Sequence, residues 1–243
     1  MKRQQLRRLL LLLSLLLFPV TLYYFSPVLI LSAGMEGVIN GSFAVFCAML
    51  LFSPLLGRLF CGWLCPAGGL QECLSSIQVR KSRQGWRNRI KYGIWAVLLA
   101  AAAFCYLTGA RPLRFNFFYE TEQGLSVTGI MSYVIYYGIL LLILVPSLLG
   151  GNRTFCHSLC WMAPFMVAGR AAGRLVHLPS LHIAADSGRC NGCRSCTRAC
   201  PMSIDVAGNV GGGSVGSSEC ILCGACVDSC PQSTLRYRMK GEV

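Results

Sequence analysis

The chain of 243 residues contains 54% apolar residues, only 13% charged residues, 15 cysteines and a formal net charge of +13. Typical soluble domains carry about 25% charged residues, so this composition excludes an ordinary soluble or disordered protein. The cysteine count is odd and the chain is too long for a small secreted scaffold, which argues against a disulfide framework. We therefore expect a membrane protein whose cysteines bind metal.

Four apolar stretches are long enough to cross a bilayer as helices, for which about 20 residues are needed. They run roughly over residues 9–32, 38–59, 92–107 and 128–149. The third stretch is short, and Gly109 and Ala110 extend it. The sequence thus predicts an all-α membrane domain with four transmembrane helices over residues 1–178.

Lysine and arginine residues are unevenly distributed between the predicted loops. Of the 22 in the chain, only Arg111 and Arg114 lie between spans three and four, and the other 20 lie on the opposite side of the membrane. Cytoplasmic loops carry the excess of basic residues, so we expect a multi-pass protein of the cytoplasmic (inner) membrane with both termini in the cytoplasm. Orientation accounts for the positive charge, and no nucleic-acid partner is predicted.

From about Pro179 the chain contains eight cysteines in two matched runs, each ending in Cys-Pro. The runs are Cys190-x-x-Cys193-x-x-Cys196-x-x-x-Cys200-Pro201 and Cys220-x-x-Cys223-x-x-Cys226-x-x-x-Cys230-Pro231. This spacing is typical of bacterial two-cluster ferredoxins, in which the fourth cysteine of each run ligates the other cluster. The predicted ligands are Cys190, Cys193, Cys196 and Cys230 for the first 4Fe-4S cluster, and Cys220, Cys223, Cys226 and Cys200 for the second. Zinc is the alternative for C-x-x-C pairs, but two complete runs favour iron–sulfur clusters in a small α+β domain over residues 179–243.

A second set of cysteines lies in a repeated motif of the membrane part. The pattern Arg-x-Phe-Cys-x-x-Leu-Cys occurs at residues 58–65 and again 95 residues later (153 minus 58) at residues 153–160. The repeat predicts a duplicated two-helix unit with the functional site between its halves. Cysteines four positions apart lie on one helix face, so Cys61, Cys65, Cys156 and Cys160 are expected to gather at the cytoplasmic boundary. Three interpretations stay open: an additional metal or iron–sulfur centre, redox-active thiol pairs, and small residues that allow close packing.

The four spans, the two C-x-x-x-C motifs and the terminal ferredoxin together resemble the NapH-like membrane polyferredoxins, 4Fe-4S proteins related to the membrane half of NosR-type regulators. The resemblance covers almost the whole chain. The second motif departs from the family pattern. Trp161 follows its second cysteine, whereas Pro66 follows that of the first motif, and the next proline is Pro164. The resemblance implies electron transfer between a quinone pool or cytoplasmic donor and a redox partner protein, with both cysteine motifs taking part in the quinone-linked step.

No acid–base or nucleophilic site is visible in the sequence. We therefore predict a membrane-bound electron-transfer subunit of an oxidoreductase system rather than a stand-alone enzyme. Its expected cofactors are two 4Fe-4S clusters, and its expected partners are redox proteins, the membrane and quinone. The alternative function is that of a redox-sensing regulatory or metallocofactor-assembly membrane protein. A transporter is disfavoured because the spans contain almost no charged residues.

Overall fold

The computed structural model of the protein describes residues 2–75, 77, 80–82, 85–109 and 112–240. Two residues used in the predictions lie outside the described residues: Ala110, which extended the third span, and Arg111, which was counted in the charge distribution. The elements before the tail are α1 (Arg3–Leu16), α2 (Phe18–Thr21), η1 (Leu22–Phe25), α3 (Pro27–Met35), β1 (Val38–Asn40), α4 (Gly41–Leu56), α5 (Leu59–Trp63), α6 (Pro66–Leu74), α7 (Arg87–Thr108), β2 (Arg114–Asn116), α8 (Ile130–Gly150), α9 (Thr154–Ser158) and α10 (Ala163–Leu175). The tail contains β3 (Ser180–Ala185), η2 (Ser187–Arg189), α11 (Ser195–Ala199), α12 (Val206–Asn209), η3 (Val210–Gly212), α13 (Ala225–Asp228) and β4 (Leu235–Lys240).

Two of the predicted spans are single helices that are long and apolar enough to cross a bilayer. These are α7 with 22 residues and α8 with 21. Most of their apolar side chains face outward, as expected for helices in contact with lipid. The third and fourth predicted spans are therefore confirmed as helices of sufficient length.

The first and second predicted spans differ from straight spanning helices. The first is bent by 59° where α1 meets α2 and η1, and α3 follows only after Ser26. Pro19 and Pro27 lie at the starts of α2 and α3, and proline has no N–H with which to continue a preceding helix. The second is shortened to the 16 residues of α4, because residues 38–40 form a strand and the Asn40 side chain caps the helix by accepting a hydrogen bond from the Phe43 amide.

The two repeated motifs have the same local structure. The helices α5 and α9 begin and end at equivalent motif positions, 95 residues apart (154 minus 59). In each motif the amide of the second cysteine donates to the phenylalanine carbonyl, with N–O distances of 3.0 Å for Cys65–Phe60 and 3.0 Å for Cys160–Phe155. The helix after the motif starts at Pro66 in the first repeat but two positions later in the second. There Trp161 lies outside the helix and donates from its indole N–H to the Phe25 carbonyl.

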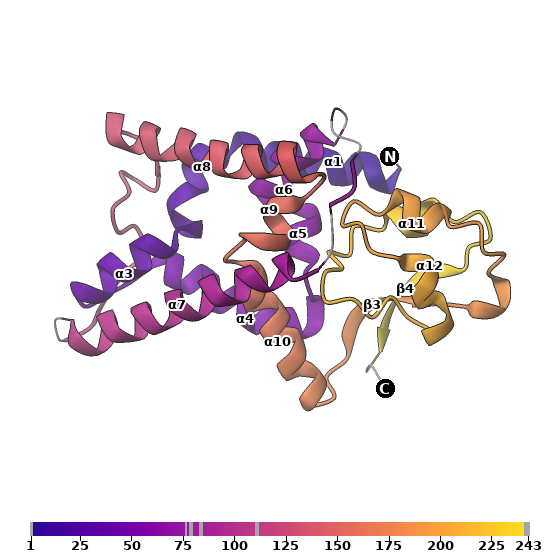
Figure 1. The fold of residues 1–243 in the computed structure, drawn as a ribbon. Coiled ribbons are helices and arrows are strands. Elements are labelled where there is room, and N and C mark those ends of the chain that lie inside the picture. Colours follow the sequence, from indigo (N-terminus) through magenta and orange to yellow (C-terminus); the bar gives the residue numbers. More distant parts are fainter. Residues whose placement is uncertain (1, 76, 78–79, 83–84, 110–111, 241–243) are drawn as a thin grey trace.

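The helices cross so that the two motifs lie in the centre of the molecule. The helix α4 packs against α10, α1 against α6 and α3 against α7, while α9 contacts both α7 and α8. Figure 1 shows α7 and α8 extending from this centre to one side, with the tail on the other. A short parallel pair of strands, β1 and β2, joins the loops at the far ends of the helices.

The tail is built on the antiparallel pair β3 and β4, whose register runs from Ser180 opposite Lys240 to Ala185 opposite Leu235. Between these strands lie the two cysteine runs, each of which contains a short helix, α11 or α13. The two runs have matching backbones. The φ angle is positive at 72° for Gly192 and 53° for Leu222, which are equivalent, and at 55° for Arg194 and 74° for Gly224, which are also equivalent. A glycine thus supplies one of the two left-handed positions in each loop.

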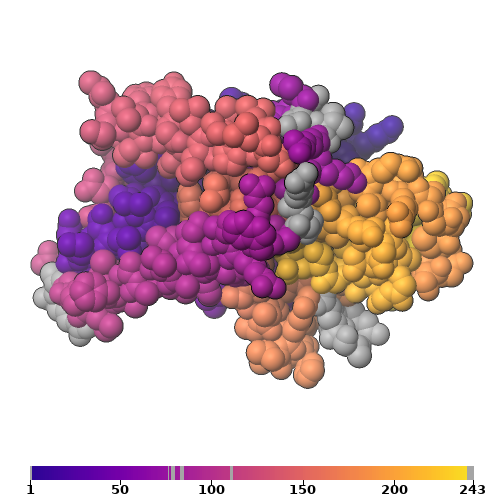
Figure 2. Space-filling model, viewed as in Figure 1, coloured from indigo at the N-terminus to yellow at the C-terminus, as the bar shows by residue number. Residues whose placement is uncertain are grey.

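The tail is packed directly onto the helical part, as Figure 2 shows for the side on which the ends of α1 and α7 lie. One buried cluster of apolar side chains runs through both parts of the chain. It includes Phe46 of α4 and Cys61 of α5 together with Ile183, Ile221 and Leu235 of the tail. This shared core holds the tail in one position against the two motifs.

Candidate metal centres

A small pocket in the tail is lined by the four cysteines expected to hold the first cluster. Cys190, Cys193 and Cys196 come from the first run, and Cys230 reaches the same pocket from the end of the second. Cys190 and Cys193 are exposed to solvent, Cys230 is half-buried and Cys196 is buried. The first centre therefore faces the outside of the molecule.

The cysteines expected to hold the second cluster lie deeper. Cys220, Cys223 and Cys226 are buried and Cys200 is half-buried. The Cys226 thiol interacts electrostatically with the other three. Burial raises the pKa of Cys200 to about 11 and that of Cys226 further, so these thiols ionise only at a high free-energy cost unless a cation binds them. Soft thiolate donors in two crossed sets of four fit 4Fe-4S clusters.

No group of three or more His, Cys, Asp or Glu side chains among the described residues converges tightly enough to hold one metal ion. This geometry differs from that of a zinc site, where all ligands meet a single ion at about 2.0–2.3 Å. In a 4Fe-4S cluster each cysteine binds a different iron, so the sulfur atoms are spread further apart.

The cysteines of the repeated motifs, here called the membrane-face cysteines, are brought together in the centre of the molecule. Cys61, Cys65, Cys156 and Cys160 are each at most 5% exposed. Cys65 interacts electrostatically with the other three. Burial raises the pKa of Cys65 well above its usual value and that of Cys160 to about 12. These two thiols, like Cys200 and Cys226 of the tail, require a compensating positive charge in order to ionise.

Contacts between the two motifs follow the symmetry of the repeat. The Gln71 amide donates to the Cys156 sulfur at 3.1 Å, and the Cys61 sulfur lies 4.0 Å from the Met166 sulfur. Gln71 and Met166 are equivalent, since each lies ten positions after the first cysteine of its own motif. Each repeat therefore contacts the first cysteine of the other.

A buried ion-pair network joins the first motif to the tail. Glu219, directly before the second cysteine run, binds Arg58 with an Nη1–Oε2 distance of 3.0 Å and also pairs with Lys91. Arg58 donates further to the Ser218 carbonyl at 3.1 Å. Burial alone would raise the pKa of Glu219, but the charges of Arg58 and Lys91 lower it below its usual value. The neighbouring His157 is neutral, because burial lowers its pKa to about 4.

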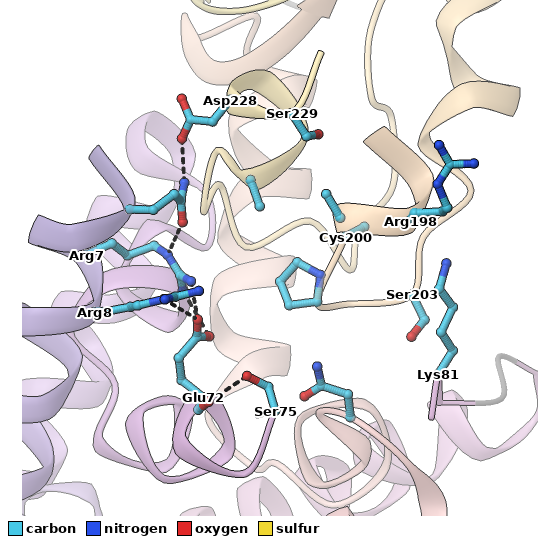
Figure 3. A pocket seen from close by; sticks show the side chains of 15 residues that line it. Arg7, Arg8, Glu72, Ser75, Lys81, Arg198, Cys200, Ser203, Asp228 and Ser229 are labelled. Carbon is cyan, nitrogen blue, oxygen red and sulfur yellow. Dashed lines mark hydrogen bonds and ion pairs between the residues drawn. The ribbon is translucent and has the colours of Figure 1, made fainter. Parts of the chain in front are cut away.

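A second network lies on the other side of the motifs. Glu72 of α6 binds Arg153 of the second motif, with an Nη2–Oε2 distance of 3.0 Å, and also pairs with Arg7 of α1. Burial would raise the pKa of Glu72, but these two arginines lower it. Figure 3 shows Glu72 reaching toward Arg7 and Arg8 at the edge of a pocket of about 460 Å³, whose opposite wall includes Cys200.

The second cysteine run of the tail lies directly on the first motif. A Cβ atom at Gly62 would overlap the Ile221 carbonyl oxygen. The Trp63 indole donates to the Leu222 carbonyl at 3.0 Å. A Cβ atom at Gly62 would also lie 3.5 Å from the Cys223 nitrogen, so the segment that follows Cys61 is in direct contact with the second run. The buried second cluster site therefore adjoins the membrane-face cysteines, whereas the first cluster site faces solvent.

An apolar pocket of about 740 Å³ borders the same motif on the side of α1 and α4. Its wall includes Met49, Phe60, Trp63 and Met166, and Met166 is the residue that contacts Cys61. The pocket is large enough for the ring of a small apolar ligand.

Comparison with known proteins agrees with this geometry. A family model described as a 4Fe-4S dicluster domain matches residues 182–231, and one described as a 4Fe-4S binding domain matches twice, at residues 41–87 and 134–179. Similar proteins include the putative electron transport protein YccM of Escherichia coli (27% identical, over 79% of this chain and 54% of the relative) and the ferredoxin-type protein NapH of Haemophilus influenzae (24%, 78% and 65%). An uncharacterized protein of Methanocaldococcus jannaschii is 25% identical over 77% of this chain and 67% of its own length. No solved structure matches.

The chain is a NapH-like 4Fe-4S polyferredoxin. It spans between about half and two thirds of the length of the relatives named above. Iron–sulfur electron transfer follows as its general function, and association with a membrane agrees with the helices α7 and α8. The relation to NosR-type regulators stays a prediction.

Sequence reasoning missed the buried charges of this polyferredoxin. Three of them belong to no sequence motif, yet each makes an ion pair in the layer between tail and helices: Glu72, Glu219 and Lys91. One signal was present: the chain has only nine acidic residues, and these two glutamates lie beside cysteine motifs.

Replacing Glu219 by glutamine is expected to destabilise the polyferredoxin by about 3–5 kcal/mol, because Arg58 and Lys91 would be left as buried cations without an anion. The measurement is the midpoint of thermal loss of iron–sulfur absorbance, with iron content determined before heating. Glu122→Gln, a change at an exposed position of the α7–α8 loop, serves as the control. An equal midpoint in both variants would contradict a stabilising role for the network.

Proposed function

We propose that this polyferredoxin passes electrons between the membrane quinone pool and a redox partner protein in the cytoplasm. The main observation in support is the order of the cysteine sites. The solvent-exposed first site is followed by the buried second site, and the second site is packed on the membrane-face cysteines. A partner protein would exchange electrons at the exposed end, near Cys190 and Cys193. The opposite end adjoins the apolar pocket.

Two 4Fe-4S clusters would be held by the tail cysteines in the crossed sets predicted from the spacing. When bound, they supply one-electron couples whose potentials depend on hydrogen bonds and burial. The protein holds the two sites in one rigid unit, because β3 and β4 close the tail and the shared core fixes it to the helices. It also excludes water from the inner site, where Cys220, Cys223 and Cys226 are buried.

The membrane-face cysteines would hold a third redox centre, and we favour an iron–sulfur centre over thiol pairs. Each match to the 4Fe-4S binding domain contains only two of these cysteines, so a four-cysteine site requires both repeats. The mutual contacts of Gln71 and Met166 with the opposite motif support such a shared site.

Quinone would bind in the apolar pocket beside Cys61. Oxidation of one quinol to quinone releases two electrons and two protons. The two electrons would go to the partner protein and the two protons to solvent. Clusters held by the tail cysteines would supply the one-electron couples that this transfer requires. The pocket supports this assignment by its size, its apolar wall and the contact of Met166 with Cys61.

The proposal includes a membrane arrangement. Residues 1–178 would form the membrane domain, with the bent segment α1–α3 and the shorter α4 completing four crossings together with α7 and α8. Residues 179–243 would form the ferredoxin domain in the cytoplasm, in the inner (cytoplasmic) membrane orientation with both termini inside. The excess of basic residues on the tail side of α7 and α8 supports this orientation.

Filling the apolar pocket is expected to slow reduction of the clusters by quinol without affecting their reduction by dithionite. Ala48 lies in the pocket wall, so Ala48→Trp places a bulky ring inside it. The variant should lose most of its rate of cluster reduction by duroquinol, a soluble quinol, while dithionite still reduces the tail clusters fully. The measurement is anaerobic stopped-flow absorbance of the full-length protein in nanodiscs.

The matched control is Ala96→Trp, which adds the same ring to an outward face of α7 away from the pocket. An unchanged duroquinol rate in Ala48→Trp, with normal iron content, would contradict quinone binding at this place. Absence of any reaction with duroquinol in the unaltered protein would contradict the quinone-linked function itself.

A further inference from the structure

The two motif arginines are buried cations at equivalent positions of the repeat. Arg58 is 1% exposed and Arg153 is 0% exposed. Each begins the Arg-x-Phe-Cys-x-x-Leu-Cys pattern, and the 95-residue offset of the repeat relates them (153 minus 58). A buried guanidinium is costly unless anions and hydrogen-bond acceptors surround it.

The protein supplies carboxylates for these arginines, but each carboxylate is shared with a second cation. Glu219 pairs with both Arg58 and Lys91, and Glu72 pairs with both Arg153 and Arg7. A third partner of Glu72, Arg8, is exposed, so among the buried charges each group of three has one positive charge in excess. Two uncompensated positive charges remain buried in the layer between tail and helices.

Hydrogen-bond donors are also left over. The Nε atoms of Arg58 and Arg153, and the Nη2 atom of Arg58, have no hydrogen-bond partner among the described residues. The remaining nitrogen of Arg153, Nη1, is 3.4 Å from the Cys61 carbonyl oxygen. Buried unpaired donors are rare in native proteins and indicate a missing acceptor.

The neighbouring groups that can become anionic are cysteines of two different sites. Arg58 interacts electrostatically with Cys61 of the membrane-face set and with Cys220 of the second tail site. Arg153 likewise interacts with Cys156 of the membrane-face set and with Cys223 of the second tail site. The hydrogen bonds agree with this placement: Arg58 of the first motif binds the Ser218 carbonyl, two residues before Cys220, and Arg153 of the second motif lies against the Cys61 carbonyl.

We infer that Arg58 and Arg153 are positioning residues that hold two positive charges beside the membrane-face centre and the second tail cluster and raise the reduction potentials of both. The inference rests on the proposed function, since it requires a redox centre at the membrane-face cysteines. Reduction adds a negative charge to a centre, and a nearby buried cation stabilises that charge more strongly than a solvent-exposed one would. A positive charge close to two centres acts on both, so removing it should lower both potentials.

The test is an EPR-monitored redox titration of the full-length, iron-loaded protein in nanodiscs. Arg58→Gln and Arg153→Gln should each lower the reduction equilibrium constants of the membrane-face centre and the second tail cluster about tenfold, which is about 59 mV for a one-electron couple. The first tail cluster should keep its potential and serves as an internal reference. Arg58→Lys and Arg153→Lys keep the charge and should stay close to the unaltered protein, which a purely structural role of the guanidinium would not predict. Arg114→Gln removes an exposed charge of β2, which belongs to neither motif nor to the tail, and should change no potential.

Unchanged potentials in both glutamine variants at full iron content would overturn the inference. If the glutamine variants lose iron, the lysine variants provide the test. Potentials like those of the unaltered protein would support the charge effect. A tenfold drop in the reduction equilibrium constants of the lysine variants would contradict it. An unaltered protein that contains only the tail irons shows that the proposed third centre is wrong. In that protein, a lower potential of the second tail cluster in Arg153→Gln still supports the arginine effect, and an unchanged one overturns it.

Discussion

Replacing Cys61 and Cys156 together by serine is expected to reduce the iron content from about twelve atoms per chain to about eight, since each 4Fe-4S cluster contains four irons. Electron exchange with quinol should stop, whereas dithionite should still reduce both tail clusters. The measurements are iron analysis, EPR of the reduced protein and stopped-flow reduction by duroquinol.

The large effect follows from the place of these two thiols. Each is the first cysteine of its motif, is buried, and contacts a side chain of the other repeat. A serine hydroxyl is a poor ligand for iron in a cluster, so loss of one thiolate from each repeat removes half of the shared site. The tail cysteines are on separate loops and are not changed.

The control is Cys47→Ser combined with Cys105→Ser. These two cysteines are half-buried and lack ligand spacing, so we expect them to act as small apolar side chains. About eight irons in both the unaltered protein and the Cys61/Cys156 variant, together with loss of the quinol reaction in that variant alone, would favour redox-active thiol pairs. If the Cys61/Cys156 variant keeps its iron content and its reaction with quinol, these two cysteines have only a packing role.

Gly62→Ala is expected to slow electron transfer between quinol and the tail while leaving every cluster in place. The added methyl group would overlap the Ile221 carbonyl, which is backbone and cannot rotate away. The second cysteine run must therefore move off the first motif, which lengthens the path between Cys61 and Cys223. We expect a severalfold lower rate of tail-cluster reduction by duroquinol and a loss of about 1–3 kcal/mol in stability from overpacking.

Gly211→Ala is the matched control, because a Cβ atom at this tail glycine would meet nothing within 4 Å. Iron content and EPR spectra should be the same in both variants. A normal duroquinol rate in Gly62→Ala would show that the Gly62–Ile221 contact is not part of the electron path.

The cysteine pattern allowed much of this protein to be predicted before its structure was described. Ligand spacing is a local property, so the two ferredoxin runs and the repeated motif could be read from neighbouring residues. The third and fourth spans were predicted correctly because continuous apolar runs of about 20 residues have few alternatives to a helix. The prediction of the first two spans was less accurate. Pro19 and Pro27 interrupt the first helix, and the cap at Asn40 makes the second helix begin later in the chain.

The order of residues by itself thus determined the local features: the spacing of the cysteine runs, the repeat of the motif, and the uneven distribution of basic residues along the chain. The arrangement of the sites relative to one another was not determined in this way. Contacts such as Arg58–Glu219, Gln71–Cys156 and Gly62–Ile221 join residues separated by 161, 85 and 159 positions (219 minus 58, 156 minus 71 and 221 minus 62). Only the packing of the tail on the helices brings these groups together and buries them. That packing decides which cluster site faces solvent, which adjoins the membrane-face cysteines, and that two arginines lie beside both.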